Sequence, residues 1–168
     1  MVGNGMGAKN GILFKTAASL EAAGQVSVVA LDKTGTITTG EPKVTDIMPW
    51  GGISETELIQ LAASLESKSE HPLSRAILQR AEETGIQISE ITDFAALPGN
   101  GLSAVLEGKS LAGGNLNYIR TKAQIPQSLA DAADKLAAQG KTPLYFSRDH
   151  QVLGLIAVAD VIKEEDEI

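Results

Sequence analysis

Apolar positions in the chain recur at two spacings, and each spacing predicts one kind of element. An apolar residue every three or four positions predicts helices, and the segments with this pattern are 17–23, 54–67, 72–85 and 128–140. Short apolar and β-branched runs bounded by glycine, proline or aspartate predict strands. These runs are 44–48, 92–96, 102–107, 109–113, 144–147 and 152–158. The succession predicts an antiparallel sheet with helices packed on it.

The first 43 residues have a different pattern. Residues 11–15 and 26–31 are short apolar runs that predict strands, and the second run leads directly into Asp32. Such a run followed at once by an acid predicts a buried parallel strand with a carboxylate at its C-terminal edge, where ligands bind in open α/β sheets. Because this strand has few partners within the sequence, residues 1–40 are expected to be mobile, irregularly packed or paired with another copy.

The two patterns predict two domains. Residues 1–43 are interpreted as the first part of an α/β domain, residues 44–158 as a domain inserted into it, and residues 159–168 as the returning connection. An inserted domain enters and leaves its host at neighbouring points. The connectors near 39–44 and 158–162 are therefore expected to form a two-stranded hinge.

Composition narrows the possible functions. Of the 168 residues, 43% are hydrophobic and 21% are charged, which is typical of a globular protein. The net charge of −7 argues against nucleic-acid binding, which needs a basic face. The absence of cysteine excludes disulfides and thiolate metal sites. No apolar stretch approaches the ~18 residues of a membrane-spanning helix, and no signal peptide is visible, so the chain itself is expected to be soluble and cytosolic.

The residues around Asp32 suggest phosphoryl chemistry. Gly35 lets the backbone turn tightly behind the acid, and Lys33 places a cation beside it. Thr34 and Thr36 bring hydroxyl and backbone N–H groups to a space the size of a phosphate. An aspartate in this position can attack a phosphoryl group and carry it as an acyl phosphate. A lone aspartate after a strand is more often an ordinary cap or turn residue.

Residues 32–38, Asp-Lys-Thr-Gly-Thr-Ile-Thr, closely resemble the phosphorylation motif of P-type ATPases, the ion pumps that cycle through an aspartyl-phosphate. The resemblance implies that Asp32 is the phosphorylated residue, with Lys33 and Thr34 as catalytic neighbours. It also implies that Asp32 contacts Mg²⁺ together with later segments of the family's phosphorylation domain, which this sequence does not contain.

Soluble phosphatases of the haloacid dehalogenase superfamily resemble the same site and are the nearest alternative. They carry a second aspartate two positions after the nucleophile, which acts as general acid and base for fast hydrolysis. Here that position is Thr34, which is neither a proton donor nor a base near neutral pH. A phosphoaspartate at Asp32 is therefore expected to persist, as a pump requires.

Four features further along the chain resemble the nucleotide-binding domain of heavy-metal-transporting P-type ATPases. They are the Ser-Glu-His-Pro run at 69–72, an acid upstream of it, and the glycine-containing stretches 99–104 and 113–115. The residues that this resemblance assigns to an ATP site are Glu66, His71, Gly99, Gly101, Gly114 and Asn115.

The resemblance also implies a role for each feature. Glu66 would accept a hydrogen bond from the adenine amino group, and His71 would stack against the base. The glycines of 99–104 would let the backbone lie flat against adenine or ribose, and Gly114 and Asn115 would line the far side of the pocket. Taken singly, each feature has a simpler interpretation as a capping histidine, a solvated acid at a helix end, or glycines in turns.

Together these features imply the fold class and the activity. The fold is expected to be α/β, with an antiparallel sheet flanked by helices inserted in an incomplete dehalogenase-like phosphorylation domain. The chain would be the ATP-binding part of a metal-translocating P-type ATPase, with ATP and Mg²⁺ as cofactors. In isolation it is expected to bind ATP without hydrolysing it at a useful rate.

Copper(I) export is the expected transport, because residues 10–15 and 65–73 look most like those of copper exporters. Zinc, cadmium and silver stay open, since the transported ion would be bound by membrane helices outside this sequence. The chain would then be a cytoplasmic domain of an integral protein of the cell membrane. The alternatives are a soluble dehalogenase-type phosphatase with a cap domain and a non-catalytic nucleotide-binding module.

Overall fold

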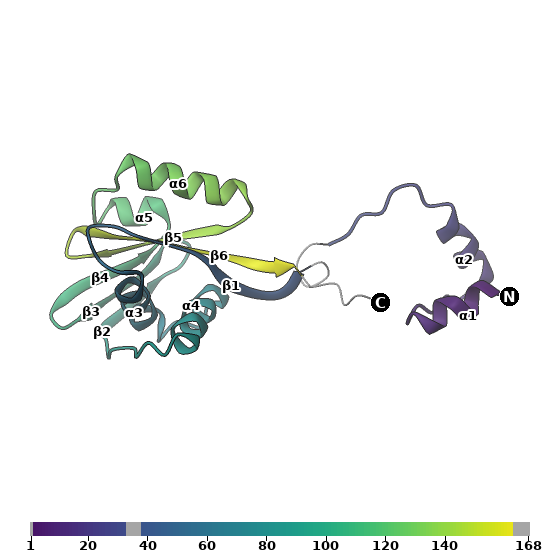
Figure 1. Ribbon diagram of the computed structural model, residues 1–168, viewed down its shortest axis with the longest axis horizontal. Helices are drawn as coiled ribbons and strands as arrows, with labels where there is room; N and C mark the ends of the chain where they lie inside the picture. The colour runs from purple at the N-terminus through teal and green to yellow at the C-terminus, as the bar shows by residue number, and fades with distance from the viewer. Residues whose placement is uncertain (1, 33–37, 163–168) are drawn as a thin grey trace. The chain divides into compact units, whose positions relative to one another are not determined.

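The computed structural model describes residues 2–32 and 38–162 (Figure 1). The chain divides into two compact units, Met1–Asp32 and Lys33–Ile168. The described residues of the larger unit form a six-stranded sheet in which every neighbouring pair of strands is antiparallel, in the order β1-β6-β5-β4-β3-β2. The strands are β1 (Thr38–Pro49), β2 (Thr92–Leu97), β3 (Gly101–Leu106), β4 (Lys109–Gly114), β5 (Thr142–Arg148) and β6 (Gln151–Ile162).

Helices cover both faces of this sheet (Figure 1). The helices α3 (Glu55–Glu66) and α4 (Pro72–Glu83) pack on one face, and α5 (Leu116–Arg120) and α6 (Gln127–Ala138) pack on the other. Successive side chains of a strand point to opposite faces. Phe146 and Ile156 therefore join the cluster under α3 and α4, whereas Tyr145 and Leu155 join the cluster under α5 and α6. The predicted fold class, an antiparallel sheet flanked by helices, is confirmed.

Local sequence signals explain where α3 and α4 begin. The hydroxyl of Ser54 accepts a hydrogen bond from the backbone N–H of Glu57, at 3.1 Å, as in a capping box, for which Ser54 and Glu57 have the right spacing. Pro72 occupies the first turn of α4, where its missing N–H costs nothing. The short helix α5 was not predicted, because only Ile119 of its five residues is buried and the apolar period cannot be read over so short a segment.

The predicted strands at 11–15 and 26–31 are wrong. Residues 12–15 and 26–32 have no regular structure. The smaller unit contains α1 (Val2–Lys9), which was not predicted, and α2 (Ala17–Gly24), which confirms the helix predicted at 17–23. Val28 is 81% exposed and Val29 is 70% exposed. A parallel strand is stable only between partners that cover it, and the described residues provide none for this run. The irregular structure expected for residues 1–40 is thus found at 26–32, whereas residues 38–40 belong to β1.

The connectors expected near 39–44 and 158–162 do lie side by side as two paired strands, although they are regular parts of β1 and β6 and not irregular links. Their use as a hinge stays a prediction. Pro42 pairs with Asp160 and Lys43 with Ala159, and the ladder continues to Thr38 and Ile162. The strand is longer than its apolar run because β6 extends equally far beside it. Proline is tolerated there since β1 is an edge strand.

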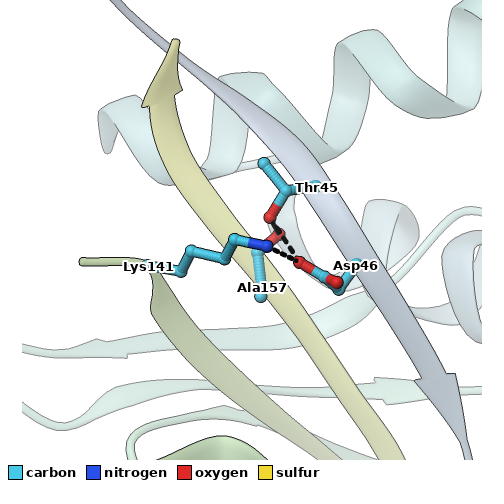
Figure 2. Close-up of polar contacts among 4 residues, drawn as sticks. All are labelled: Thr45, Asp46, Lys141 and Ala157. Carbon is cyan, nitrogen blue, oxygen red and sulfur yellow. Dashed lines mark hydrogen bonds and ion pairs between the residues drawn. The ribbon is translucent and has the colours of Figure 1, made fainter. Parts of the chain in front are cut away.

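A bulge in β1 is fixed by a polar cluster at the sheet edge (Figure 2). The Lys141 ammonium and the Thr45 hydroxyl both donate to Oδ2 of Asp46, each at 2.7 Å, and the Thr45 hydroxyl also lies 3.4 Å from the carbonyl of Ala157. Two hydrogen bonds hold the pKa of Asp46 below its usual value, and the one from Lys141 has a larger effect than the one from Thr45. The cluster ties β1 to the residue that precedes β5.

Candidate functional site: a pocket at the start of α4

The six residues that the sequence assigns to an ATP site all line one pocket. The cavity measures about 360 Å³ and lies where the end of α3, the start of α4, the loop between β2 and β3, and the start of α5 meet. Its lining includes Glu66, His71, Gly99, Gly101, Gly114 and Asn115. Segments that are separated along the chain thus converge on a cavity whose size is typical of small-molecule sites.

Glu66 is the buried acid of this pocket. It is the last residue of α3 and only 6% exposed. The hydroxyl of Ser74 donates to its Oε2 at 2.5 Å, and the Ser69 oxygen lies 2.7 Å from that hydroxyl. Because Ser74 has one proton, which it gives to Glu66, Ser69 must donate to Ser74. Oε1 of Glu66 has no hydrogen-bond partner among the residues described.

Burial raises the pKa of Glu66 above its usual value, and the hydrogen bond from Ser74 opposes this shift only in part. An acid with a raised native pKa binds its proton more tightly when the protein is folded. Its contribution to stability is therefore fully present below the unfolded-state pKa of about 4.5 and is lost as the pH rises through the native pKa.

Replacing Glu66 with glutamine is expected to remove this loss. Glutamine retains an acceptor for Ser74 and has no proton to release, so the variant should gain stability relative to the parent as the pH rises above about 4.5. Each unit of raised pKa corresponds to about 1.4 kcal/mol at higher pH. Urea unfolding of both proteins from pH 4 to 8 measures the difference, and a difference independent of pH would contradict the assignment.

His71 serves as the N-cap of α4. Its Nδ1 accepts a hydrogen bond from the backbone N–H of Leu73 at 3.2 Å, and its backbone is extended, as expected for a residue before Pro72. An Nδ1 that accepts leaves the proton of the neutral ring on Nε2. The capping interpretation of His71 is therefore correct, and the cap also holds the ring at the pocket.

Two of the predicted glycines lie opposite each other on neighbouring strands. Gly101 of β3 pairs with Gly114 of β4. A Cβ at Gly101 would lie 2.1 Å from the carbonyl oxygen of Gly113 and 2.8 Å from the Tyr118 ring, and a Cβ at Gly114 would lie 2.3 Å from the carbonyl oxygen of Asn100. Neither position can hold a side chain, so glycine is needed here for the close approach of the two strands.

Asn115 holds the glycine loop in place. Its Oδ1 accepts from the backbone N–H of Tyr118 at 2.9 Å and caps α5, while its Nδ2 donates to the carbonyl of Gly99 at 2.8 Å. The backbone N–H of Asn115 also donates to the carbonyl of Asn100. Since both ends of this side chain are engaged with the protein, Asn115 positions the pocket wall.

Sequence reasoning missed several residues of the pocket. Ser69 and Ser74 complete the hydrogen-bond chain to Glu66, and apolar side chains form the walls. These apolar residues are Leu73, Ala96, Leu97, Pro98, Leu102 and Leu144. No local signal marks them, because they become neighbours only when α3 and α4 pack on the sheet. The described lining contains neither lysine nor arginine.

Asp32 is exposed at the end of the smaller unit, while Lys33 and Thr34 lie outside the described residues. Among the residues that the structure describes, no three histidine or acidic side chains lie together in a way that could hold a metal ion. The Mg²⁺ site at Asp32 and the catalytic roles of these three residues stay predictions.

Comparison with known proteins identifies the family. The model of the haloacid dehalogenase-like hydrolases matches residues 26–167, most of the chain. This chain belongs to the haloacid dehalogenase-like hydrolase family. Within the part that is described, no helix has both the length and the apolar character needed to cross a bilayer.

Similar sequences within this family are those of P-type ATPases. The chain is 41% identical over 163 residues to a copper-transporting P-type ATPase of Rhizobium leguminosarum bv. viciae, which covers 97% of the chain and 19% of that protein. It is 40% identical over 164 residues to a copper-exporting P-type ATPase of Bacillus subtilis, and this match covers 98% of the chain and 20% of that protein. The chain thus spans about a fifth of the length of these relatives, and the resemblance on which the sequence analysis relied is confirmed.

Comparison with solved structures also finds P-type ATPases. A zinc-transporting PIB-type ATPase in the E2·Pi state superposes with a TM-score of 0.83 at 36% identity, over 97% of this chain and 26% of that one. The N-domain of HMA8, a copper-transporting P-type ATPase, superposes with a TM-score of 0.61 at 26% identity, over 70% of this chain and 99% of that one. The second match thus covers nearly all of that N-domain with part of this chain.

Proposed function

We propose that residues 44–158 bind ATP by its adenine end, as the nucleotide-binding domain of a heavy-metal-transporting P-type ATPase. The observation that carries the proposal is the convergence of Glu66, His71 and both glycine stretches on one pocket. They lie on three separate segments of the chain, 66–71, 99–104 and 113–115, which only the fold brings together.

The chemistry of the pocket suits a purine base. Apolar walls and glycine backbone accept a flat ring, and the ring of His71 is held at the edge of the cavity by its bond to Leu73. Oε1 of Glu66, which has no partner in the described part of the chain, can accept a hydrogen bond from the 6-amino group of adenine.

The charge of the pocket suits the base better than the phosphates. Its described lining has no lysine or arginine to pair with a triphosphate. Binding energy should therefore come from adenine, and the phosphates should extend toward solvent. Such a binding mode fits a mechanism with two domains. The inserted domain would bind the adenine end of ATP, and a second domain, containing Asp32, would accept the γ-phosphoryl group.

For the whole protein we propose ATP-driven export of copper(I) through an aspartyl-phosphate at Asp32. The relatives named above support copper, and the zinc transporter among the solved structures keeps the metal open to test. Lys33 and Thr34 would assist phosphoryl transfer, and the metal would be bound by membrane segments outside this chain. Mg²⁺ would neutralise charge on the phosphates, with its ligands supplied by segments beyond the residues described.

Calorimetric titration of the chain with nucleotides tests the proposal. ATP, ADP and AMP should bind with similar dissociation constants, on the order of 0.1–1 mM, and omission of Mg²⁺ should change them little. GTP should bind at least about tenfold more weakly, because its 6-oxo group places an acceptor opposite the Glu66 carboxylate. Adenine recognition would be refuted if GTP bound as tightly as ATP. It would also be refuted if ADP and AMP, which lack the γ-phosphate, did not bind.

A further inference from the structure

A second cavity lies in the larger unit and shares no lining residue with the nucleotide pocket. It measures about 530 Å³ and is formed where β1 ends, beside the turn between β5 and β6 and the segment before α6. Residues from all three places line it, among them Trp50, Ile53, Gln124, Arg148, His150 and Gln151. None of these residues has a part in the function proposed above.

The lining combines one aromatic surface with one cation. Trp50 is 39% exposed, so part of its indole surface is accessible to a ligand. The guanidinium of Arg148 makes one long ion pair, 3.6 Å from Oε1 of Glu57, and no shorter polar contact of this side chain is found in residues 38–162. Arginine presents five donors in a planar fork, so most of its capacity is available to a ligand.

The turn that carries His150 is strained. Asp149 and His150 have φ values of 47° and 69°, a pair of left-handed conformations that two-residue hairpins normally assign to asparagine and glycine. The strain is held by two anchors: Asp149 Oδ1 accepts from the backbone N–H of Ser110 at 2.9 Å, and Nδ1 of His150 lies 3.1 Å from the carbonyl of Lys122.

The second anchor fixes the ring of His150. A carbonyl can only accept, so Nδ1 must carry the proton and the neutral ring presents its Nε2 lone pair. Strained residues held by their surroundings concentrate at ligand-binding sites. Here the strain keeps an imidazole at the cavity wall, together with the indole of Trp50 and the guanidinium of Arg148.

We propose that this cavity binds a small aromatic anion, with its ring stacked on Trp50 and its carboxylate or phosphate held by Arg148. The volume lies within the usual range for small-molecule sites. The net charge of −7 disfavours general attraction of anions, so binding must depend on the local arrangement of these side chains. Gln124 and Gln151 supply neutral donors and acceptors at the rim.

Trp50 is the single tryptophan of the chain, so its indole N–H gives one resonance in a ¹⁵N–¹H spectrum and reports on this cavity alone. Titration with benzoate and with phenyl phosphate is expected to shift this resonance saturably in the millimolar range, and their relative affinities identify the preferred anionic group. Benzamide, which lacks the charge, and acetate, which lacks the ring, should bind at least tenfold more weakly. ATP should shift the resonances of the nucleotide pocket and leave the indole unchanged.

The Arg148→Gln variant should weaken the better aromatic anion at least tenfold, whereas Arg80→Gln, the same charge change on the exposed side of α4, should not alter its affinity. Thermal unfolding of both variants verifies that they are folded. The proposal is overturned if neither benzoate nor phenyl phosphate shifts the indole saturably up to 10 mM, if benzamide binds as well as they do, or if Arg148→Gln retains full affinity.

Discussion

Replacing Gly101 with alanine is expected to destabilise the larger unit by about 3 kcal/mol, at the upper end of the range for inserting a methyl group into a packed interior. The new Cβ would lie 2.1 Å from the carbonyl oxygen of Gly113 and 2.8 Å from both Gly114 Cα and the Tyr118 ring. Two of these atoms are backbone and cannot turn aside, so β3 and β4 must separate. Urea unfolding monitored by circular dichroism measures the loss.

Gly99→Ala is the matched control, because it inserts the same methyl group at the same pocket. Gly99 has a φ of 77° but no atom within 4 Å of its Cβ position, so alanine there should cost only the strain of a left-handed conformation, about 1 kcal/mol. The difference between the variants isolates the steric overlap. If both variants are equally stable, the close contact of β3 and β4 is not what requires glycine at position 101.

The His71→Asn variant is expected to bind ATP about tenfold more weakly while keeping its stability. Asparagine is among the best N-cap residues and can replace the bond from Nδ1 of His71 to the backbone N–H of Leu73. It cannot replace the ring, and stacking of an aromatic side chain on a base contributes about 1–3 kcal/mol. The substitution thus separates the two roles of His71, capping α4 and contacting the base. Calorimetry gives the affinity and urea unfolding the stability.

The same substitution at the other histidine, His150→Asn, provides the control. That residue lines the second cavity, and its left-handed backbone is one that asparagine tolerates. Its affinity for ATP should equal that of the parent protein. Parental affinity in His71→Asn would mean that the ring of His71 does not contact the base, and a marked loss of stability would mean that the cap was not preserved.

The sequence was sufficient for the parts of the fold that depend on local chemistry. The apolar period, the Ser54 cap and Pro72 predict α3 and α4, and the short runs predict all six strands of the sheet. It failed at 26–31, because an apolar run predicts a strand only when other strands are there to cover it. The same run lies exposed in the smaller unit.

The resemblance was enough to predict which residues line the candidate site. It did not predict the structural role that each of these residues has. Gly101 and Asn115 were assigned to the ligand, whereas the structure adds a packing role for the first and a positioning role for the second. The contact between Ser74 and Glu66 depends on how α3 and α4 pack, which no local pattern contains. The cavity beside Trp50 likewise has no local signal in the sequence, because its lining comes from separate segments.

The footprint of ATP on the chain tests the central claim most directly. Titration of the ¹⁵N-labelled protein with ATP should shift most strongly the backbone amides of residues 66–74, 96–102 and 113–115, the segments that meet at the pocket. The indole resonance of Trp50 and the amides of β1 should stay where they are. Shifts concentrated outside these three segments, or no saturable shift at millimolar ATP, would contradict the assignment of this pocket to adenine.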